Sequence, residues 1–492
     1  WEVISPDLTS NDPSKQQQLT SGGLSIDATT AENHTTLTVI SHSPIKEGWI
    51  WTGSDDGKVH LTQDGGETWI DLTKNINGMP DNGWVTQIVP SSYDEQSAFV
   101  VIDNHRLGDW KPHVFKTENG GKSWTNIVAD KGIEAFALSF VQHPETPNLM
   151  FLGTEFGLYY SIDGGELWSK WEMGFPSVSV TDLKVHPREN DLVAATFGRS
   201  FWVLDDLGPL EELAKNSSIQ NEKAYLFKTR PAYQAIINQA IGQRLTPAHM
   251  FTGDNHPKGA ALSYWLSGDD SVTLTVSKAE KKIYLWQEYG SQGLNRTNWN
   301  LEKAGKPIYG PLMSPVLERP LVAPGEYTIE LNVGNKKMTQ PLTVLPDPRI
   351  DYDPQAFADN EVLRNKLEVI NSSKDALIDS LEHIERMLKL RTQKEYEALA
   401  DSIREKVNLV WDLIAFRNVQ GAISDSPKLG HQISKAFYYM HSPYEPVTEN
   451  DRVVITALQD QLANVQSTYT DVLLPHWQRF KRKVAVEGFK FD

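Results

Sequence analysis

Acidic residues recur where pairs of predicted strands turn back on themselves, and carboxylates are well suited to catalysis. Asp55 follows the run GWIWTGS, Asp103 follows SAFVVI, and Glu155 follows NLMFLGT. Aligning these segments places the three acids at equivalent hairpins, and Phe197 takes that position in a fourth segment. Two carboxylates flanking a glycosidic bond serve as acid and base or nucleophile in most glycoside hydrolases. Asp55, Asp103 and Glu155 are therefore candidate catalytic residues.

The same hairpins have a second interpretation, as a rim that binds a ligand without reacting with it. Acidic side chains suit tight turns, because they accept hydrogen bonds from nearby backbone N–H groups. In a fold that gathers such loops at one mouth, ligands bind there. The candidate rim residues are Asp56, His105, Arg106 and Arg199.

The most distinctive loop runs from Asp103 to His113 and reads DNHRLGDWKPH. Its two histidines and two aspartates are metal-ligand types, but their spacing matches no established metal motif. A loop that carries Trp110 also suits packing on a neighbouring unit. We predict no metal site and no cofactor.

Three octapeptides share one pattern, Ser/Thr-x-Asp/Asn-x-Gly-x-x-Trp: TQDGGETW at 62–69, TENGGKSW at 117–124 and SIDGGELW at 161–168. The third residue can accept backbone N–H bonds of the turn, and the fifth, glycine, tolerates a positive φ. The tryptophan covers the turn and offers an indole N–H. A catalytic residue would occur once, so we interpret these turns as structural. Their residues are Asp64, Gly66, Trp69, Asn119, Gly121, Trp124, Asp163, Gly165 and Trp168.

The octapeptides belong to a larger repeated unit of β-rich segments. We place four units at 28–73, 84–128, 133–172 and 178–206, the last without the octapeptide. A unit of four antiparallel strands that recurs at intervals of roughly 45–65 residues is typical of β-propeller blades.

The rest of the chain changes character twice. Residues 207–222 are polar and are predicted to be a linker. Strand-like segments over 223–347 indicate an Ig-like or FnIII-like β-sandwich, and apolar residues at helical spacing over 350–484 indicate a bundle of α-helices. The predicted fold is mainly β with an α-helical C-terminal domain.

Composition excludes several classes of function. The 492 residues include no cysteine, which rules out disulfides and Cys-ligated zinc. The formal net charge of −17 disfavours nucleic-acid binding. No apolar run is long enough to span a bilayer, so no transmembrane segment is predicted.

The octapeptides match the Asp-box, or BNR repeat. Phrases such as WTGSDDGKVHLTQDGG, LGTEFGLYYSIDGG, ATFGRSFWVLDDL and APGEYTIEL resemble large secreted bacterial BNR-repeat, sortilin-like propeller proteins, often labelled glycosyl hydrolases. The resemblance covers nearly the whole chain and implies a bacterial, secreted or periplasmic protein. The chain departs from the family at Phe197, where relatives usually have histidine. It lacks the Arg-Ile/Leu-Pro sequence of sialidases and the cysteines of animal sortilin receptors.

The segment WEVI at 1–4 aligns with WIDL at 69–72 and WTNI at 124–127, so Trp1 takes the place of an Asp-box tryptophan. The chain thus resembles the C-terminal half of such a protein. We expect residues 1–4 to be the outer strand of a blade whose other strands lie elsewhere. The expected partner is the missing N-terminal propeller half, as another chain or the removed part of the same protein.

The sequence leaves two functions open. The first is a non-catalytic propeller protein that binds a protein, peptide or glycan, or assembles with partner chains. The second is a glycoside hydrolase acting on a polysaccharide. Hydrolysis requires two of the candidate carboxyls to lie about 5–10 Å apart.

Overall fold

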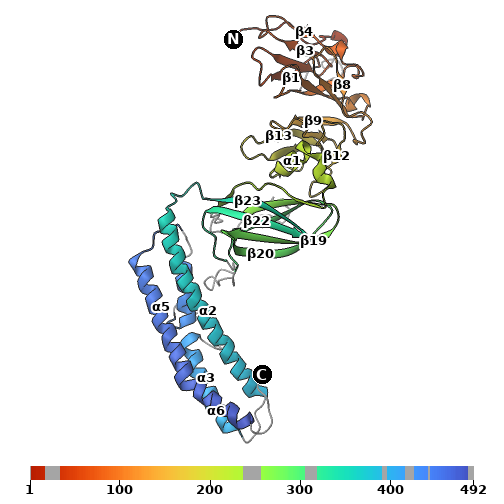
Figure 1. Ribbon diagram of the computed structural model, residues 1–492. Helices are drawn as coiled ribbons and strands as arrows, with labels where there is room; N and C mark the ends of the chain where they lie inside the picture. The colour runs from red at the N-terminus through yellow and green to blue at the C-terminus, as the bar shows by residue number, and fades with distance from the viewer. Residues whose placement is uncertain are drawn as a thin grey trace. The chain divides into compact units, whose positions relative to one another are not determined.

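The computed structural model describes residues 2–16, 34–235, 256–304, 319–390, 396–415, 426–440 and 444–485. The described chain is mainly β, in several sheets, and ends in a helical region (Figure 1). It divides into two compact units. The first comprises Trp1–Lys228, Ser263–Ser271 and Tyr289–Arg296, and the second comprises Thr229–Leu262, Val272–Glu288 and Thr297–Asp492.

The described residues of the N-terminal part form four antiparallel sheets in which each strand pairs with its neighbour in sequence. The first three have four strands and the fourth has three. The first sheet is β1 (Leu37–His42), β2 (Ile50–Ser54), β3 (Val59–Thr62) and β4 (Ile70–Asp71); the second is β5 (Trp84–Pro90), β6 (Ala98–Asp103), β7 (His113–Thr117) and β8 (Thr125–Asn126); the third is β9 (Ala137–Gln142), β10 (Met150–Thr154), β11 (Gly157–Ser161) and β12 (Ser169–Lys170); the fourth is β13 (Val180–Val185), β14 (Leu192–Thr196) and β15 (Phe201–Leu204).

These sheets stack in chain order. We call the first strand of each sheet its inner strand and the last its outer strand. The inner strand of each sheet packs against the inner strand of the next sheet: β1 against β5, β5 against β9, and β9 against β13. Strands β6 and β10 are buried along their whole length, which explains why they read as continuous apolar runs. Trp51 is fully buried in the core of the first two sheets, where it meets Trp124 edge-on with ring centroids 6.0 Å apart.

The segment expected to be a linker is largely helical. It contains α1 (Gly208–Lys215) and the 3-10 helix η4 (Ser217–Asn221). Leu207, Leu210 and Leu213 are buried in the same core as the third and fourth sheets. Their three-residue spacing puts them on one helical face, and this signal is easily missed among the polar residues around it.

Two further sheets follow. One has the strand order β16-β18-β21 and the other β17-β23-β22-β19-β20. In the second, β17 pairs parallel to β23 and β22 pairs antiparallel to both β23 and β19. The strands are β16 (Ala224–Leu226), β17 (Ala232–Gln234), β18 (Ala260–Leu266), β19 (Asp270–Lys278), β20 (Lys281–Gly290), β21 (Gly293–Trp299), β22 (Gly325–Val333) and β23 (Lys336–Pro346).

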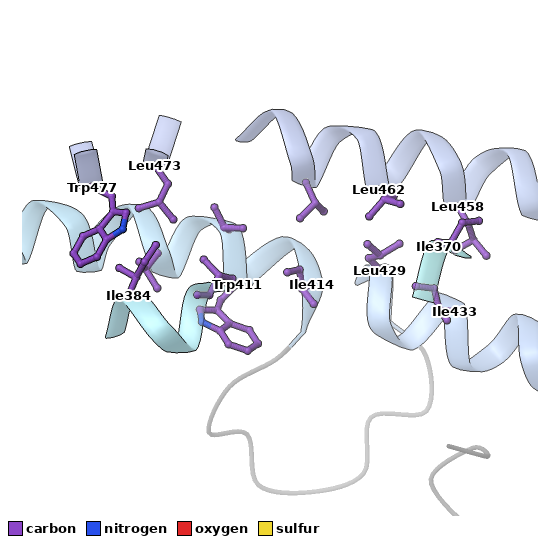
Figure 2. Packing of buried hydrophobic residues seen from close by; sticks show 14 of the residues in the cluster. Ile370, Ile384, Trp411, Ile414, Leu429, Ile433, Leu458, Leu462, Leu473 and Trp477 are labelled. Atoms are coloured by element: carbon purple, nitrogen blue, oxygen red, sulfur yellow. The ribbon is translucent and has the colours of Figure 1, made fainter. Parts of the chain in front are cut away.

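The C-terminal helices share one hydrophobic core, and Figure 2 shows part of it around Ile370, Trp411 and Leu458. A capping box starts α5, where the Thr448 side chain accepts from the Asp451 N–H and the Asp451 side chain accepts from the Thr448 N–H. In the part of the chain that the structure describes, no helix has the length and apolar character to cross a bilayer. The helices are α2 (Pro354–Leu390), α3 (Glu397–Ile414), α4 (Leu429–Tyr439), α5 (Glu449–Ser467), the π-helical turn η6 (Thr468–Leu473) and α6 (Leu474–Ala485).

Candidate functional site

The octapeptide turns adopt the same hydrogen-bond pattern in all three sheets. In the first turn, Asp64 Oδ1 accepts from the Thr62 hydroxyl (2.7 Å) and from the Thr68 N–H (2.9 Å), and Thr62 Oγ1 accepts from the Gly66 N–H (2.9 Å). Asn119 and Asp163 repeat this pattern. The hydrogen bonds from Thr68 and Thr62 hold the pKa of Asp64 well below its usual range.

The glycine of each turn has a positive φ, 108° at Gly66, 83° at Gly121 and 93° at Gly165. A side chain at Gly121 would meet Leu72, which follows the outer strand of the preceding sheet, and one at Gly165 would meet Ile127 in the same way. The third turn is also joined to the second sheet by the Trp168 Nε1–H, which donates to Ile127 O (3.0 Å). The turns therefore connect one sheet to the next.

The predicted hairpin acids lie at equivalent ends of their sheets. Asp55 and Asp56 occupy the turn between β2 and β3, Asp103 ends β6, and Glu155 lies between β10 and β11. Asp55, Asp56 and Asp103 are each at least nine-tenths buried. Phe197, at the matching position of the fourth sheet, is 78% exposed.

A small hollow of about 30 Å³ brings part of this ring together. Asp55, Asp103 and Arg106 line it, but Glu155 and Arg199 do not. The remaining lining residues, which the sequence analysis did not single out, are His34, Asn82, Trp84, Asn104 and Leu107.

Each acid at this end of the sheets has its own partners. Burial raises the pKa of Asp55, against a hydrogen bond from the Thr36 N–H (2.8 Å) that lowers it. Asp103 contacts His105 Nδ1 at 2.6 Å. Burial alone would raise the pKa of Asp56, but hydrogen bonds from Ser10 and Ser54 outweigh it and leave the pKa lowered.

Glu155 accepts a hydrogen bond from the Ser179 hydroxyl (2.5 Å), at the start of the fourth sheet. Arg199 is exposed at the turn between β14 and β15. Neither side chain joins Asp55 and Asp103 in the hollow.

Two polar atoms of the hollow's lining are buried and have no hydrogen-bond partner among the residues that the structure describes. They are His34 Nε2 and Asn104 Oδ1, on side chains 5% and 8% exposed. The other ring nitrogen of His34, Nδ1, lies 3.8 Å from Asp55 Oδ2. Leaving such atoms unpaired costs about 1–3 kcal/mol each, so they are positions where a ligand or water would gain hydrogen bonds. The sequence offers no signal for either, since both depend on chain segments meeting in space.

Arg106 and the distinctive loop form one wall. The Arg106 guanidinium lies over the ring of Trp84, 3.8 Å from its centroid. His105 stacks on Phe136 of the neighbouring segment with centroids 4.4 Å apart, and Trp110 meets the same ring edge-on. The loop thus packs on the next sheet, which is one of its two predicted roles.

The histidines of the loop do not converge. His105 contacts Asp103, whereas His113 Nε2 contacts Asp109 Oδ2 at 2.8 Å. Among the described residues, no group of three or more His, Asp or Glu side chains has a metal-binding arrangement.

No protein-family model matches the chain, and no curated protein matches it. Among solved structures, the GH74 enzyme of Niastella koreensis is 14% identical over 33% of this chain and 26% of its own, with a TM-score of 0.24. The extracellular domain of a hybrid two-component system from B. thetaiotaomicron is 10% identical over 67% of this chain and 39% of its own, with a TM-score of 0.28. YCF48 from Cyanidioschyzon merolae is 18% identical over 34% of this chain and 52% of its own, with a TM-score of 0.25. The chain therefore spans about a quarter to a half of these proteins.

Proposed function

We propose that this chain is a non-catalytic propeller protein of the Asp-box, sortilin-like kind, which binds a protein, peptide or glycan. In this proposal the four stacked sheets are propeller blades, residues 223–347 form a sandwich, and residues 350–484 form a helical bundle that serves as a docking module. The missing N-terminal half, as another chain or as the removed part of the same protein, supplies the remaining blades. The proposed location is secreted or periplasmic, in a bacterium.

The binding role rests on one observation: His34 Nε2 and Asn104 Oδ1 are buried in the lining of the hollow, and no described residue makes a hydrogen bond to either atom. The nearby acids support it, because Asp103 contacts His105 and Asp56 accepts from Ser10 and Ser54. These acids are already engaged by other groups of the chain. The hollow therefore offers hydrogen bonds to a polar group of a ligand.

The size of the hollow limits what enters it. A volume of about 30 Å³ accommodates one small polar group, such as a hydroxyl or an amide. The ligand as a whole would extend over the rim, where Arg106 and Trp84 present a cation and an aromatic edge. Glycans and peptides both carry such groups on larger bodies.

The test is a screen of the protein on glycan and peptide arrays, followed by affinity measurement by calorimetry for each hit. The variants His34→Ala and Asn104→Ala should each weaken binding about tenfold or more, on the scale of one lost buried hydrogen bond. His42→Ala is the matched control, because His42 is exposed on β1 and does not line the hollow. A ligand that binds all four proteins equally would rule out the hollow as the site.

One observation favours a glycoside hydrolase as the second candidate. Asp55 and Asp103 line the same hollow, and burial raises the pKa of Asp55, as a general acid requires. If this is the function, polysaccharide hydrolysis should be abolished by both Asp55→Asn and Asp103→Asn and unaffected by Asp182→Asn, which changes an exposed carboxyl on β13. Measuring released reducing sugar at several pH values decides between the two proposals.

A further inference from the structure

The hollow between the first two sheets is lined by groups of two kinds, polar groups that accept hydrogen bonds and apolar surface. The apolar surface comes from Trp84 and Leu107. The polar groups include those of His34, Asp55 and Asn104, and each of these residues is more than nine-tenths buried. A hollow with both kinds of lining suits a ligand group that is polar at its tip and apolar along its stem.

The hydrogen-bond roles of the two buried atoms follow from their neighbours. The Asn104 Nδ2–H donates to Asp109 Oδ2 (3.4 Å), which fixes the orientation of the amide and leaves Oδ1, an acceptor. In His34, Nδ1 lies 3.8 Å from Asp55 Oδ2, and a neighbouring carboxylate favours the neutral tautomer with its proton on Nδ1. Nε2 is then an acceptor as well. No described residue donates to either atom, so a group that satisfies both must bring at least two donors.

The two carboxylates of the hollow, Asp55 and Asp103, form no ion pair with a lysine or arginine of the described chain. Asp55 accepts from the Thr36 N–H (2.8 Å), and burial raises its pKa. Asp103 contacts His105 Nδ1 at 2.6 Å. A buried negative charge is stabilised by a positive charge placed beside it, so the hollow favours a cation. The formal net charge of the chain, −17, also attracts cations from solution.

Arg106 brings a positive charge to the lining, but its position limits the effect. Its guanidinium lies over the ring of Trp84, 3.8 Å from the centroid, and the residue is exposed. Water and salt therefore screen its charge, whereas Asp55 and Asp103 are buried. The buried part of the lining therefore carries negative charge.

Size and donor count together select among cations. A volume of about 30 Å³ has room for about two water-sized groups. The ammonium of a lysine is a compact charge with three N–H donors on a flexible apolar stem. The guanidinium of an arginine spreads its donors over three nitrogens in a rigid plane and is larger. The hollow therefore fits an ammonium better than a guanidinium.

We propose that the hollow binds the side-chain ammonium of a lysine carried by a peptide or protein partner. The ammonium donates to Asn104 Oδ1 and His34 Nε2 and pairs with Asp55. The methylene stem of the lysine packs on Trp84 and Leu107. This inference rests on the proposed binding function and narrows its ligand to a lysine-bearing polypeptide. An amino sugar fits less well, because its ammonium is attached directly to a ring that is larger than the hollow.

The probe for a direct test is a pentapeptide with one lysine between glycines, acetylated at its N-terminus and amidated at its C-terminus. Its lysine then carries the only ammonium group. Saturation-transfer difference NMR with the whole 492-residue chain detects its binding even when the affinity is low. Matched peptides with acetyl-lysine or arginine in place of lysine should bind about tenfold more weakly, because acetylation removes the charge and arginine is too large.

Substitutions in the lining should change the affinity in opposite directions. Asp55→Asn and Asn104→Ala should each weaken binding of the lysine peptide about tenfold or more, since each loses a charge-assisted interaction. Arg106→Gln should strengthen binding about twofold or more, because it removes a like charge. Asp182→Asn is the control, since it changes an exposed carboxyl on β13 outside the hollow, and it should leave the affinity unchanged. Thermal melts show that each variant is folded before affinities are compared.

Several results would overturn the proposal. They are no detectable binding of the lysine peptide, equal binding of the acetyl-lysine or arginine peptide, and weaker binding by Arg106→Gln, which would indicate an anionic ligand. Binding of a glucosamine pentasaccharide but not of the lysine peptide would assign the hollow to an amino sugar and would also overturn it.

These outcomes are distinct from failure of the binding function itself. A ligand without an ammonium group that still requires His34 and Asn104 would refute the lysine inference and leave the binding function standing. A lysine peptide that binds the His34→Ala and Asn104→Ala variants as well as the unmodified protein would refute the hollow as the site of both.

Discussion

Asp55 and Asp64 are both turn carboxylates, yet their surroundings shift their pKa values in opposite directions. Asp64 is exposed, and hydrogen bonds from Thr68 and Thr62 stabilise its charged form, which lowers the pKa. Asp55 is buried, and the loss of hydration disfavours its charged form, which raises the pKa. An aspartate at a hairpin therefore stabilises the turn in one case, and in the other it is a buried carboxyl whose charged form is disfavoured.

Asp55→Asn should stabilise the protein at neutral pH. The folded-state pKa of Asp55 is raised, so ionisation favours the unfolded chain, and this destabilisation grows as pH rises above about 4, the unfolded value. The neutral amide avoids it and can still accept from the Thr36 N–H. Thermal melts should show a higher Tm for the variant at pH 7 and no difference at pH 3. A lower Tm at pH 7 would mean that the charged form is favoured by the fold.

At the scale of elements, the octapeptide turns act as connectors between neighbouring sheets. Each holds its own backbone through the Asp or Asn side chain. Leu72, after the outer strand of the first sheet, packs on Gly121 in the turn of the second sheet. Ile127, after the outer strand of the second sheet, packs on Gly165 in the turn of the third. The tryptophans add buried area where two sheets meet, as Trp124 does against Trp51.

Trp124→Ala should lower the free energy of unfolding by about 3–5 kcal/mol, the usual cost of truncating a buried aromatic side chain. Trp124 is 8% exposed and Trp110 is 56% exposed. Trp110→Ala is therefore the control and should cost clearly less. Urea denaturation followed by circular dichroism measures both. Equal losses would show that Trp124 does not contribute to the joint between the first two sheets.

Gly153, in the middle of β10, is required by close packing rather than by a turn. A Cβ there would lie 2.5 Å from Val180 O on the fourth sheet and would also meet the Ser139 hydroxyl. Gly153→Ala should therefore push the third and fourth sheets apart and cost about 1–3 kcal/mol.

Gly268→Ala is the matched change, because a Cβ at Gly268 has no neighbour within 4 Å. Its Tm should stay close to that of the unmodified protein. Comparable Tm losses in the two variants would refute the packing explanation.

At the scale of the whole molecule, the helical region has a core of its own. Residues from all of its helices, from Leu363 in α2 to Val484 in α6, form one cluster of buried side chains. Figure 2 shows Ile384, Ile414 and Trp477 within this cluster. A region that buries its apolar stripe among its own helices does not need the β-sheets to fold.

A protein of residues 350–492 alone should therefore be folded and strongly helical. Far-ultraviolet circular dichroism at neutral pH should show minima at about 208 and 222 nm, with a cooperative thermal transition. The control is the same protein with Ile403→Asp, which puts a charge into the core and should abolish that transition. A random-coil spectrum of the parent would contradict an independent region.

Local patterns in the sequence were enough to predict the mainly β architecture and the C-terminal helical region. Octapeptides, hairpin signals and three- and four-residue apolar steps are properties of neighbouring residues, so they can be read without a fold. For α1, tertiary packing decided the outcome, because three leucines at helical spacing outweighed a polar composition.

The candidate site depended on the tertiary structure. Asp55, Asp103 and Arg106 could be named from their hairpins. His34 and Asn104 became notable only in the folded chain, where their polar atoms are buried with no hydrogen-bond partner in the described segments. Burial and hydrogen bonding between distant segments set those properties, along with the raised pKa of Asp55. Sequence spacing determines which residues share a turn, whereas the packing of sheets determines which turns share a site.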